Sequence, residues 1–92
     1  MNKEIIINGK SYNLKKIDFS AICLLEEFGF SASDLKGKTF SSIRACFAFH
    51  SSLDLIKAGE EIEAHIKNKG KFEDFAPFIT SVVESDFFQS LS

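Results

Sequence analysis

Phenylalanine is the residue that most constrains what this chain can fold into. It occurs 11 times among 92 residues, beside a single Tyr and no Trp. Each Phe offers roughly 150–250 Å² of surface to bury and has no proton, charge or ligand atom to contribute. A chain this short buries only about 60–65% of its unfolded surface, so its core is small. We therefore expect some rings to lie at a surface that contacts a partner or a second copy of the chain.

The C-terminal part of the chain carries the candidate partner-binding residues. They are Phe72, Phe87, Phe88 and Leu91. Phe87 and Phe88 are adjacent, so on a helix their side chains diverge by about 100° and one small core cannot easily bury both. We expect one ring to anchor the tail and the other to face a partner. Leu91 follows them by four and three positions and extends either face.

Charge and composition exclude several kinds of partner. The net charge is −2, and the only arginine, Arg44, stands against ten lysines. Because Arg is the preferred reader of phosphates and bases, we expect no nucleic-acid partner. No apolar run approaches the ~18 residues of a membrane span, and the N-terminal apolar stretch is too short for a signal peptide. Cys23 and Cys46 lack CxxC spacing and read as buried thiols of a cytosolic protein.

No constellation of residues indicates catalysis, a metal or a cofactor. His50 lies on an apolar helical stripe and reads as a hydrogen-bonded histidine at the edge of the core. His65 follows Glu61 by four residues, the spacing of an ordinary surface pair. The serines lack a GxSxG motif, and the scattered glycines build no phosphate loop. We expect a protein that is not an enzyme.

The N-terminal residues 3–15 predict a β-hairpin. Asn8-Gly9 is the favoured two-residue type I′ turn, because both central positions require positive φ. This turn pairs Ile7 with Lys10. Each residue before Ile7 on the first strand then pairs with the corresponding residue after Lys10 on the second strand. Strand side chains alternate, so one face is predicted to carry Ile5, Ile7, Tyr12 and Leu14. A two-stranded hairpin is barely stable alone, so this face must pack on helices.

Helical patterns fill the rest of the chain, at about residues 19–28, 42–50, 53–68 and 74–85. The second pattern is apolar around most of its girth, which places it at the centre of the core. The predicted N-caps of the four helices are Asp18, Ser41 or Ser42, Ser52, and Asp74. Gly29 and Gly70 are expected to end the first and third helices.

These elements predict an α+β fold that is mostly α, with an N-terminal β-hairpin and about four helices packed as a small bundle. The sequence shows no repeat or linker, so residues 1–92 are expected to form one domain. Within it, residues 3–15 form the hairpin and residues 18–91 the helical part. Gly59 lies inside the third helical pattern and suggests close packing against a neighbouring helix.

The order of these pieces resembles the tail assembly chaperones of long-tailed bacteriophages and prophages of Gram-positive bacteria. The resemblance is carried by residues 7–14 (INGKSYNL), 18–19 (DF), 22–29 (ICLLEEFG), 42–45 (SIRA), 58–63 (AGEEIE), Gly70 and 84–88 (ESDFF). These segments span nearly the whole chain, and it is their order and spacing that carry the resemblance.

The resemblance implies a small, mostly helical protein without enzymatic activity. Members of this family bind the long hydrophobic tape measure protein in the bacterial cytoplasm and keep it soluble. Tail tube protein then assembles around the tape measure, and the chaperone is absent from the finished virion. The family has no motif-defined functional residues, so none is transferred to this chain. An exposed apolar surface, net charge for solubility and self-association would all suit such a role.

Two other functions fit part of the same pattern. A small phage or bacterial regulatory module, such as an inhibitor of a host protein, would also be acidic, compact and rich in Phe. It would form a defined one-to-one complex, whereas a chaperone would bind a long client in many copies. A helix-turn-helix reader of nucleic acid is the weaker alternative, because residues 52–55 (SLDL) place an acid and two leucines where basic and polar residues are needed.

Overall fold

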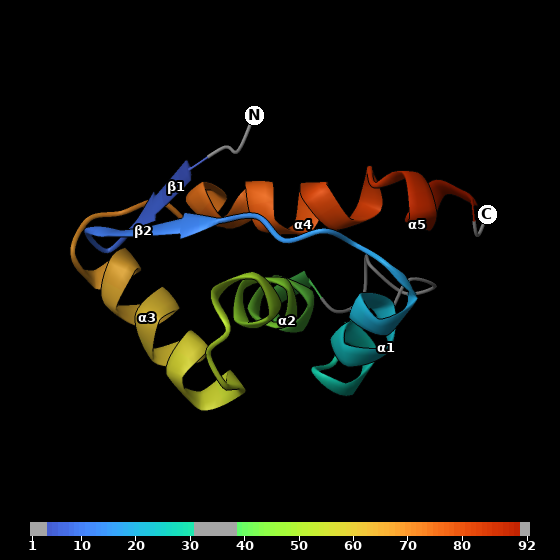
Figure 1. Cartoon of the computed structure of the whole chain (residues 1–92). Helices are drawn as coiled ribbons and strands as arrows, with labels where there is room; N and C mark the ends of the chain where they lie inside the picture. The colour runs from blue at the N-terminus through green and yellow to red at the C-terminus, as the bar shows by residue number, and fades with distance from the viewer. Residues whose placement is uncertain (1–3, 31–38, 91–92) are drawn as a thin grey trace.

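The computed structural model describes residues 4–30 and 39–90. In chain order the elements are β1 (Glu4–Ile7), β2 (Lys10–Asn13), α1 (Phe19–Glu27), α2 (Thr39–Ser51), α3 (Leu55–Lys67), the 3₁₀ helix η1 (Phe72–Phe75), α4 (Ala76–Val83) and α5 (Asp86–Ser90). The fold is α+β and mostly α, with an antiparallel hairpin before the helices, as predicted. In Figure 1, α2 lies in the centre, with α1 and α3 on either side and α4 and the hairpin above it.

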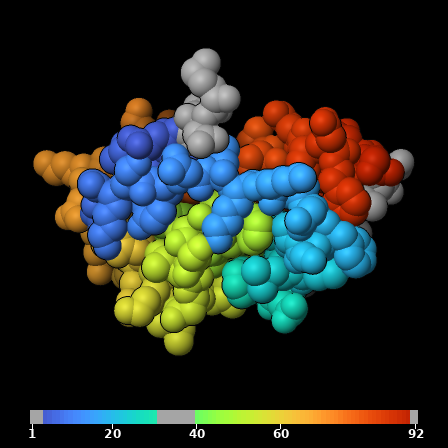
Figure 2. All heavy atoms as spheres, viewed as in Figure 1, coloured from blue at the N-terminus to red at the C-terminus, as the bar shows by residue number. Residues whose placement is uncertain are grey.

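The hairpin has the predicted turn and register. Asn8 and Gly9 have φ values of 54° and 79°, which is the type I′ signature, and Ile7 pairs with Lys10. Ile5 and Ile7 are buried, and Tyr12 and Leu14 pack partly buried on the same core. Ile6 points the other way and is 54% exposed. The chain then crosses one face of the molecule to reach α1, as Figure 2 shows.

Helix α1 begins and ends as its sequence predicts. The carboxylate of Asp18 accepts a hydrogen bond from the backbone N–H of Ala21 at 2.9 Å. At the other end Gly29 takes a φ of 104°, and the N–H of Phe30 bonds to the carbonyl of Leu25 at 2.9 Å. This Schellman arrangement brings the buried Phe30 beside the turn that it closes.

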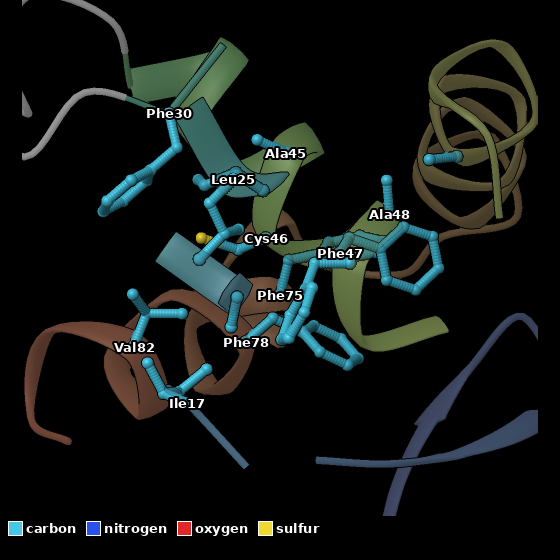
Figure 3. Packing of buried hydrophobic residues seen from close by; sticks show 14 of the residues in the cluster. Ile17, Leu25, Phe30, Ala45, Cys46, Phe47, Ala48, Phe75, Phe78 and Val82 are labelled. Carbon is cyan, nitrogen blue, oxygen red and sulfur yellow. The ribbon is translucent and has the colours of Figure 1, made fainter. Parts of the chain in front are cut away.

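Helix α2 forms the centre of the core, and it contacts α1, α3, α4 and β2. Its buried residues are Ser42, Ile43, Ala45, Cys46, Phe47, Ala48, Phe49 and His50. Figure 3 shows Phe47 against Phe75 and Phe78, and Cys46 beside Leu25 of α1. Centroids of the Phe47 and Phe78 rings are 5.1 Å apart, and those of Phe47 and Phe75 are 5.2 Å apart. Edge-on aromatic packing of this kind holds α2 to α4.

Three predicted helix starts are wrong. Helix α2 begins at Thr39, which places Ser42 in its second turn, where the side chain is fully buried. Asp54 rather than Ser52 caps α3, because its carboxylate accepts from Lys57 N at 2.7 Å. Ser52 instead takes a positive φ of 65° in the preceding turn. Asp74 lies inside η1, and α4 starts two residues later with Pro77 in its first turn, where a missing N–H costs nothing.

The apolar face predicted for α3 consists of Leu55, Ala58, Gly59, Ile62 and Ile66, and it packs partly on the core. Ala58 is buried, Leu55 and Ile62 are half-buried against the core, and Ile66 is 39% exposed. Ile56 lies off this face and is 76% exposed. At the C-terminal end, Lys69 takes the left-handed conformation, with a φ of 70°, and Gly70 comes after it. Along residues 4–30 and 39–90, no helix has both the length and the apolar character of a membrane span.

Candidate partner-binding site

Phe72, one of the predicted partner-binding residues, lies at the edge of an open aromatic surface. It starts η1 and is half-buried, with its ring tilted against that of Phe40 at a centroid distance of 5.2 Å. Phe40 comes from the first turn of α2 and is 75% exposed. On its inner side Phe72 approaches the buried Phe75 at 6.4 Å. The Phe40–Phe72 pair is therefore supported from the core and open to solvent on its outer side.

A groove of about 260 Å³ runs along this pair, between α2, α3 and η1. Its lining consists of Phe40, Ser41, Arg44, Gly59, Ile62, Glu63 and Phe72. The spacing of these residues explains the groove. Phe40 and Arg44 stand one turn apart on α2, and Gly59, Ile62 and Glu63 share one face of α3. Glycine at position 59 leaves that part of the wall without a side chain.

Gly59 lies next to the side chain of Arg44. A Cβ built on Gly59 would lie 3.8 Å from Cδ of Arg44, an ordinary van der Waals distance. The aliphatic stem of Arg44 thus runs close over the α3 backbone at Gly59. The close helix packing expected at this glycine is not found, because a Cβ would fit there and the one neighbour within 4 Å is the Arg44 side chain.

The charged side chains at the groove differ in whether they form an ion pair. Glu63 is paired with Lys67 at 3.1 Å. Arg44 is exposed, and within residues 4–30 and 39–90 it takes part in no ion pair. Among the described residues, the groove therefore presents Arg44 without an ion-pair partner beside two aromatic rings. This arrangement suits an apolar side chain with a carboxylate close to it.

The other predicted residues lie at a second surface, beyond the far end of α4. The ring of Phe87 packs edge-on against Phe19 at 6.3 Å, and Phe19 is 66% exposed. Phe88 packs against Phe30 at 6.3 Å, and Phe30 is buried. Both tail rings are half-buried and pack against the core. Phe88 also contacts the buried Phe30, whereas Phe87 also contacts the exposed Phe19. Leu91 lies outside the described residues.

The structure therefore divides the predicted site between two surfaces. Phe72 belongs to the groove, whereas Phe87 and Phe88 belong to the tail beside the start of α1 (Figure 1). Sequence reasoning missed Phe40, Phe19 and Arg44 as surface partners of these residues. Phe40 precedes the helix predicted at about residues 42–50, and the one signal that could have extended that helix to Phe40 is its helical spacing with Arg44 and Phe47.

The two histidines tie the hairpin to the C-terminal helices. His50 is buried; its Nδ1 accepts from the backbone N–H of Lys15 at 2.9 Å, and its Nε2 lies 2.8 Å from Oγ of Ser81. Because Ser81 donates to the carbonyl of Phe78, the imidazole donates to Ser81 and is neutral. Burial lowers the pKa of His50 to about 4.

His65 makes a matching connection at the turn. Its Nδ1 accepts from the backbone N–H of Asn8 at 3.0 Å, and its Nε2 lies 2.8 Å from Oδ2 of Asp74. The hydrogen bond from His65 lowers the pKa of Asp74. The expected pairing of His65 with Glu61 is wrong, because Glu61 instead pairs with Lys10 at 3.2 Å.

These polar groups have structural roles, which leaves the two aromatic surfaces as the candidate functional features. In the described part of the chain, no three His, Cys, Asp or Glu side chains are placed to hold a metal ion. Burial raises the pKa of the Cys46 thiol to about 12, so this thiol is protonated at neutral pH.

Comparison with protein-family models, with curated proteins and with solved structures finds no match to this chain. The chain's own surface, with its groove, tail and charges, is the guide to function.

Proposed function

We propose that this chain is a tail assembly chaperone of a long-tailed bacteriophage or prophage. In this role it binds and solubilises the tape measure protein in the cytoplasm of the bacterial host and helps to recruit tail tube protein. It performs no catalysis, associates with itself, and leaves before the virion is complete. The observation that carries the proposal is the groove in which the exposed Phe40 and the half-buried Phe72 stand side by side.

An exposed ring that stands beside a second ring gains free energy when a partner covers the pair. Phe40 is 75% exposed although the chain has a buried aromatic core a few residues away. Burying apolar surface gains roughly 25 cal/mol per Å², so covering the Phe40–Phe72 pair favours association with an apolar client. A tape measure protein is long, helical and apolar, and it offers such side chains repeatedly along its length.

The segments that carry the resemblance contribute to these surfaces, although Phe40 and Phe72 lie outside those segments. Residues 42–45 and 58–63 supply Arg44, Gly59, Ile62 and Glu63 to the walls of the groove. Residues 84–88 supply the tail rings, and residues 7–14 form the turn and second strand of the hairpin. The match between the resemblance and the exposed surfaces supports the proposal.

The test is co-expression with the tape measure protein encoded near this chain. We expect the tape measure protein to become soluble and to co-purify with many copies of the chain per client, measured as the mass of the complex by light scattering. The proposal is contradicted if the client stays insoluble at every level of the chain. A discrete one-to-one complex with a host protein, found in place of client binding, would identify the inhibitor-type module instead.

A further inference from the structure

The groove presents an apolar contact and a cation one helical turn apart. Phe40 lies in the first turn of α2, and Arg44 follows it by four residues on the same side of the helix. Side chains at this spacing have Cβ atoms about 5–6 Å apart. Both side chains line the groove and both are exposed. A ligand in the groove therefore meets an aromatic ring and a guanidinium group at a separation that α2 sets.

The electrostatic complement of the groove is a carboxylate. The aliphatic stem of Arg44 lies beside Gly59 of α3, and the guanidinium group has no ion-pair partner within residues 4–30 and 39–90. The acid on the facing wall, Glu63, is already paired with Lys67 at 3.1 Å. The planar fork of Arg binds a carboxylate through two parallel hydrogen bonds. An acidic group brought into the groove would therefore find an available partner there.

The size of the groove admits one large apolar side chain. Pockets that hold drug-sized ligands and cofactors usually measure about 300–1,000 Å³, and the groove at about 260 Å³ lies below that range. An apolar cavity of about 150 Å³ is sufficient to hold benzene. One phenylalanine or leucine side chain therefore fits beside the rings of Phe40 and Phe72, while the backbone of the partner stays outside the groove.

We infer that the groove recognises an amphipathic helix that carries a large apolar residue and an acidic residue one turn apart. The apolar side chain enters beside Phe40 and Phe72, and the carboxylate pairs with Arg44. The helical form of this ligand rests on the proposed function, in which the client is helical, whereas the acid follows from the charges of the groove. Segments of a client that combine an apolar residue with an acid are thus bound in preference to uniformly apolar segments.

The test uses helical peptide probes and the isolated chain. Each probe is an alanine- and glutamine-based peptide of about 18 residues, long enough to form a helix alone, with one central phenylalanine. The matching probe carries glutamate four residues before and four residues after the phenylalanine, so it fits in either direction. The neutral control carries glutamine at these positions. The opposite-face control has its two glutamates two residues from the phenylalanine, on the other side of the helix.

Fluorescence anisotropy of labelled probes measures their affinity. The matching probe is expected to bind about three- to tenfold more tightly than either control, and added salt should reduce this advantage. Arg44→Gln is expected to remove the advantage. Arg44→Glu is expected to reverse it, so that a probe with lysines in place of the glutamates binds more tightly than the matching probe. Phe40→Ser removes the ring and should weaken the binding of every probe.

A control variant separates recognition at the groove from a general effect of charge. Lys57→Glu makes the same sign change as Arg44→Glu at an exposed α3 position outside the groove, and it is expected to keep the preference of wild type. Melting temperatures near that of wild type verify that each variant is folded. Arg44→Gln makes the milder change and still tests the cation if Arg44→Glu is unfolded.

Three results would overturn the inference. Equal affinity for the matching probe and the opposite-face control would show that the position of the acid is not recognised. Undiminished preference in Arg44→Gln would show that another group binds the carboxylate. No binding of any probe would show that the groove does not take such a helix.

The outcome is distinguishable from that of the proposed function. A client kept soluble on co-expression, without a preference for the matching probe, would contradict the acidic preference alone. A clear preference for the matching probe beside an insoluble client would contradict the chaperone role alone.

Discussion

At the scale of single residues, the absence of a side chain at Gly70 allows an imidazole that makes two hydrogen bonds to pack against the backbone. Its N–H bonds to the carbonyl of His65 at 2.8 Å and closes the end of α3, while Lys69 takes the left-handed conformation. A Cβ at position 70 would lie 2.3 Å from Nε2 of His65. Gly70 is therefore required by the imidazole packed against it, and that imidazole connects the hairpin turn to η1 through Asn8 and Asp74.

Gly70→Ala is expected to destabilise the protein by about 1–3 kcal/mol, because the imidazole must move away from at least one of its two hydrogen-bond partners. Gly59→Ala is the matched control. Its Cβ would meet Arg44 at an ordinary 3.8 Å, and Ala in a helix interior is favoured over Gly by up to ~1 kcal/mol. Urea denaturation of both variants measures the difference. Equal effects of the two substitutions would contradict this role of Gly70.

At the scale of elements, the hairpin is held at both ends by imidazoles from the helices. His65 of α3 accepts from the backbone of the turn, and His50 of α2 accepts from the backbone just beyond β2. Each ring also contacts the η1–α4 segment, through Asp74 or Ser81. The N-terminal hairpin is thus linked to the C-terminal helices by two polar bridges, in addition to the apolar packing of Ile5 and Ile7.

The bridge through His50 makes stability depend on pH. The pKa of His50 falls from an ordinary 6.5 to about 4 in the folded protein, because the ring is buried and faces Lys15. Below pH 6.5 the unfolded chain takes up a proton that the folded chain does not, so stability falls as the pH is lowered from 6.5 to 4. The expected loss is about 3 kcal/mol.

Chemical denaturation at a series of pH values measures this loss. His50→Gln retains an acceptor and a donor but does not titrate, so its stability is expected to change less over the same interval. Asp74, whose pKa is lowered, contributes its own loss only at more acidic pH. Parallel profiles for wild type and His50→Gln between pH 6.5 and 4 would show that His50 is not the titrating group.

The two tail rings are expected to respond differently to substitution. Phe88 rests on the buried Phe30, so Phe88→Ser should remove packing from the core and lower stability by about 2–3 kcal/mol. Phe87 also packs against the core, but its ring partner is the exposed Phe19, so Phe87→Ser should lower stability by less than Phe88→Ser and should weaken association as well. Melting temperature and sedimentation together separate the two effects. Equal losses of stability would place both rings in the core.

Sequence reasoning succeeded where a local signal determines the structure. The Asn8-Gly9 turn specifies the hairpin register by its backbone conformation, and the apolar girth of α2 requires a central position. The first residue of each helix was harder to predict, because several residues near each start can act as N-caps and tertiary packing selects among them. That packing buries Ser42, whose Oγ has no hydrogen-bond partner among the described residues. The groove was not predictable, because it depends on how α2, α3 and η1 meet.

At the scale of the whole molecule, the small thickness of the fold explains why aromatic side chains are exposed on its surface. The molecule measures 38 × 32 × 20 Å, and a helix with its side chains is about 10–12 Å across. Its smallest dimension thus admits about two layers of helices, and α2 is the element packed on most sides. The outer elements each keep an exposed side, and on α1 and η1 that side carries Phe19 and Phe72; Phe40 lies in the exposed first turn of α2. We take this surface to be what the chain uses to bind its client.

The most direct test of this account is the soluble fraction of the tape measure protein when it is co-expressed with two single variants of this chain. Phe40→Ser removes the exposed ring at the groove, and Ile56→Ser removes an equally exposed apolar side chain outside it, at 75% and 76% exposure. We expect Phe40→Ser to leave most of the client insoluble and Ile56→Ser to keep it soluble as wild type does, with both variants folded. Full solubility with Phe40→Ser, or equal losses with both variants, would contradict the central role of the groove.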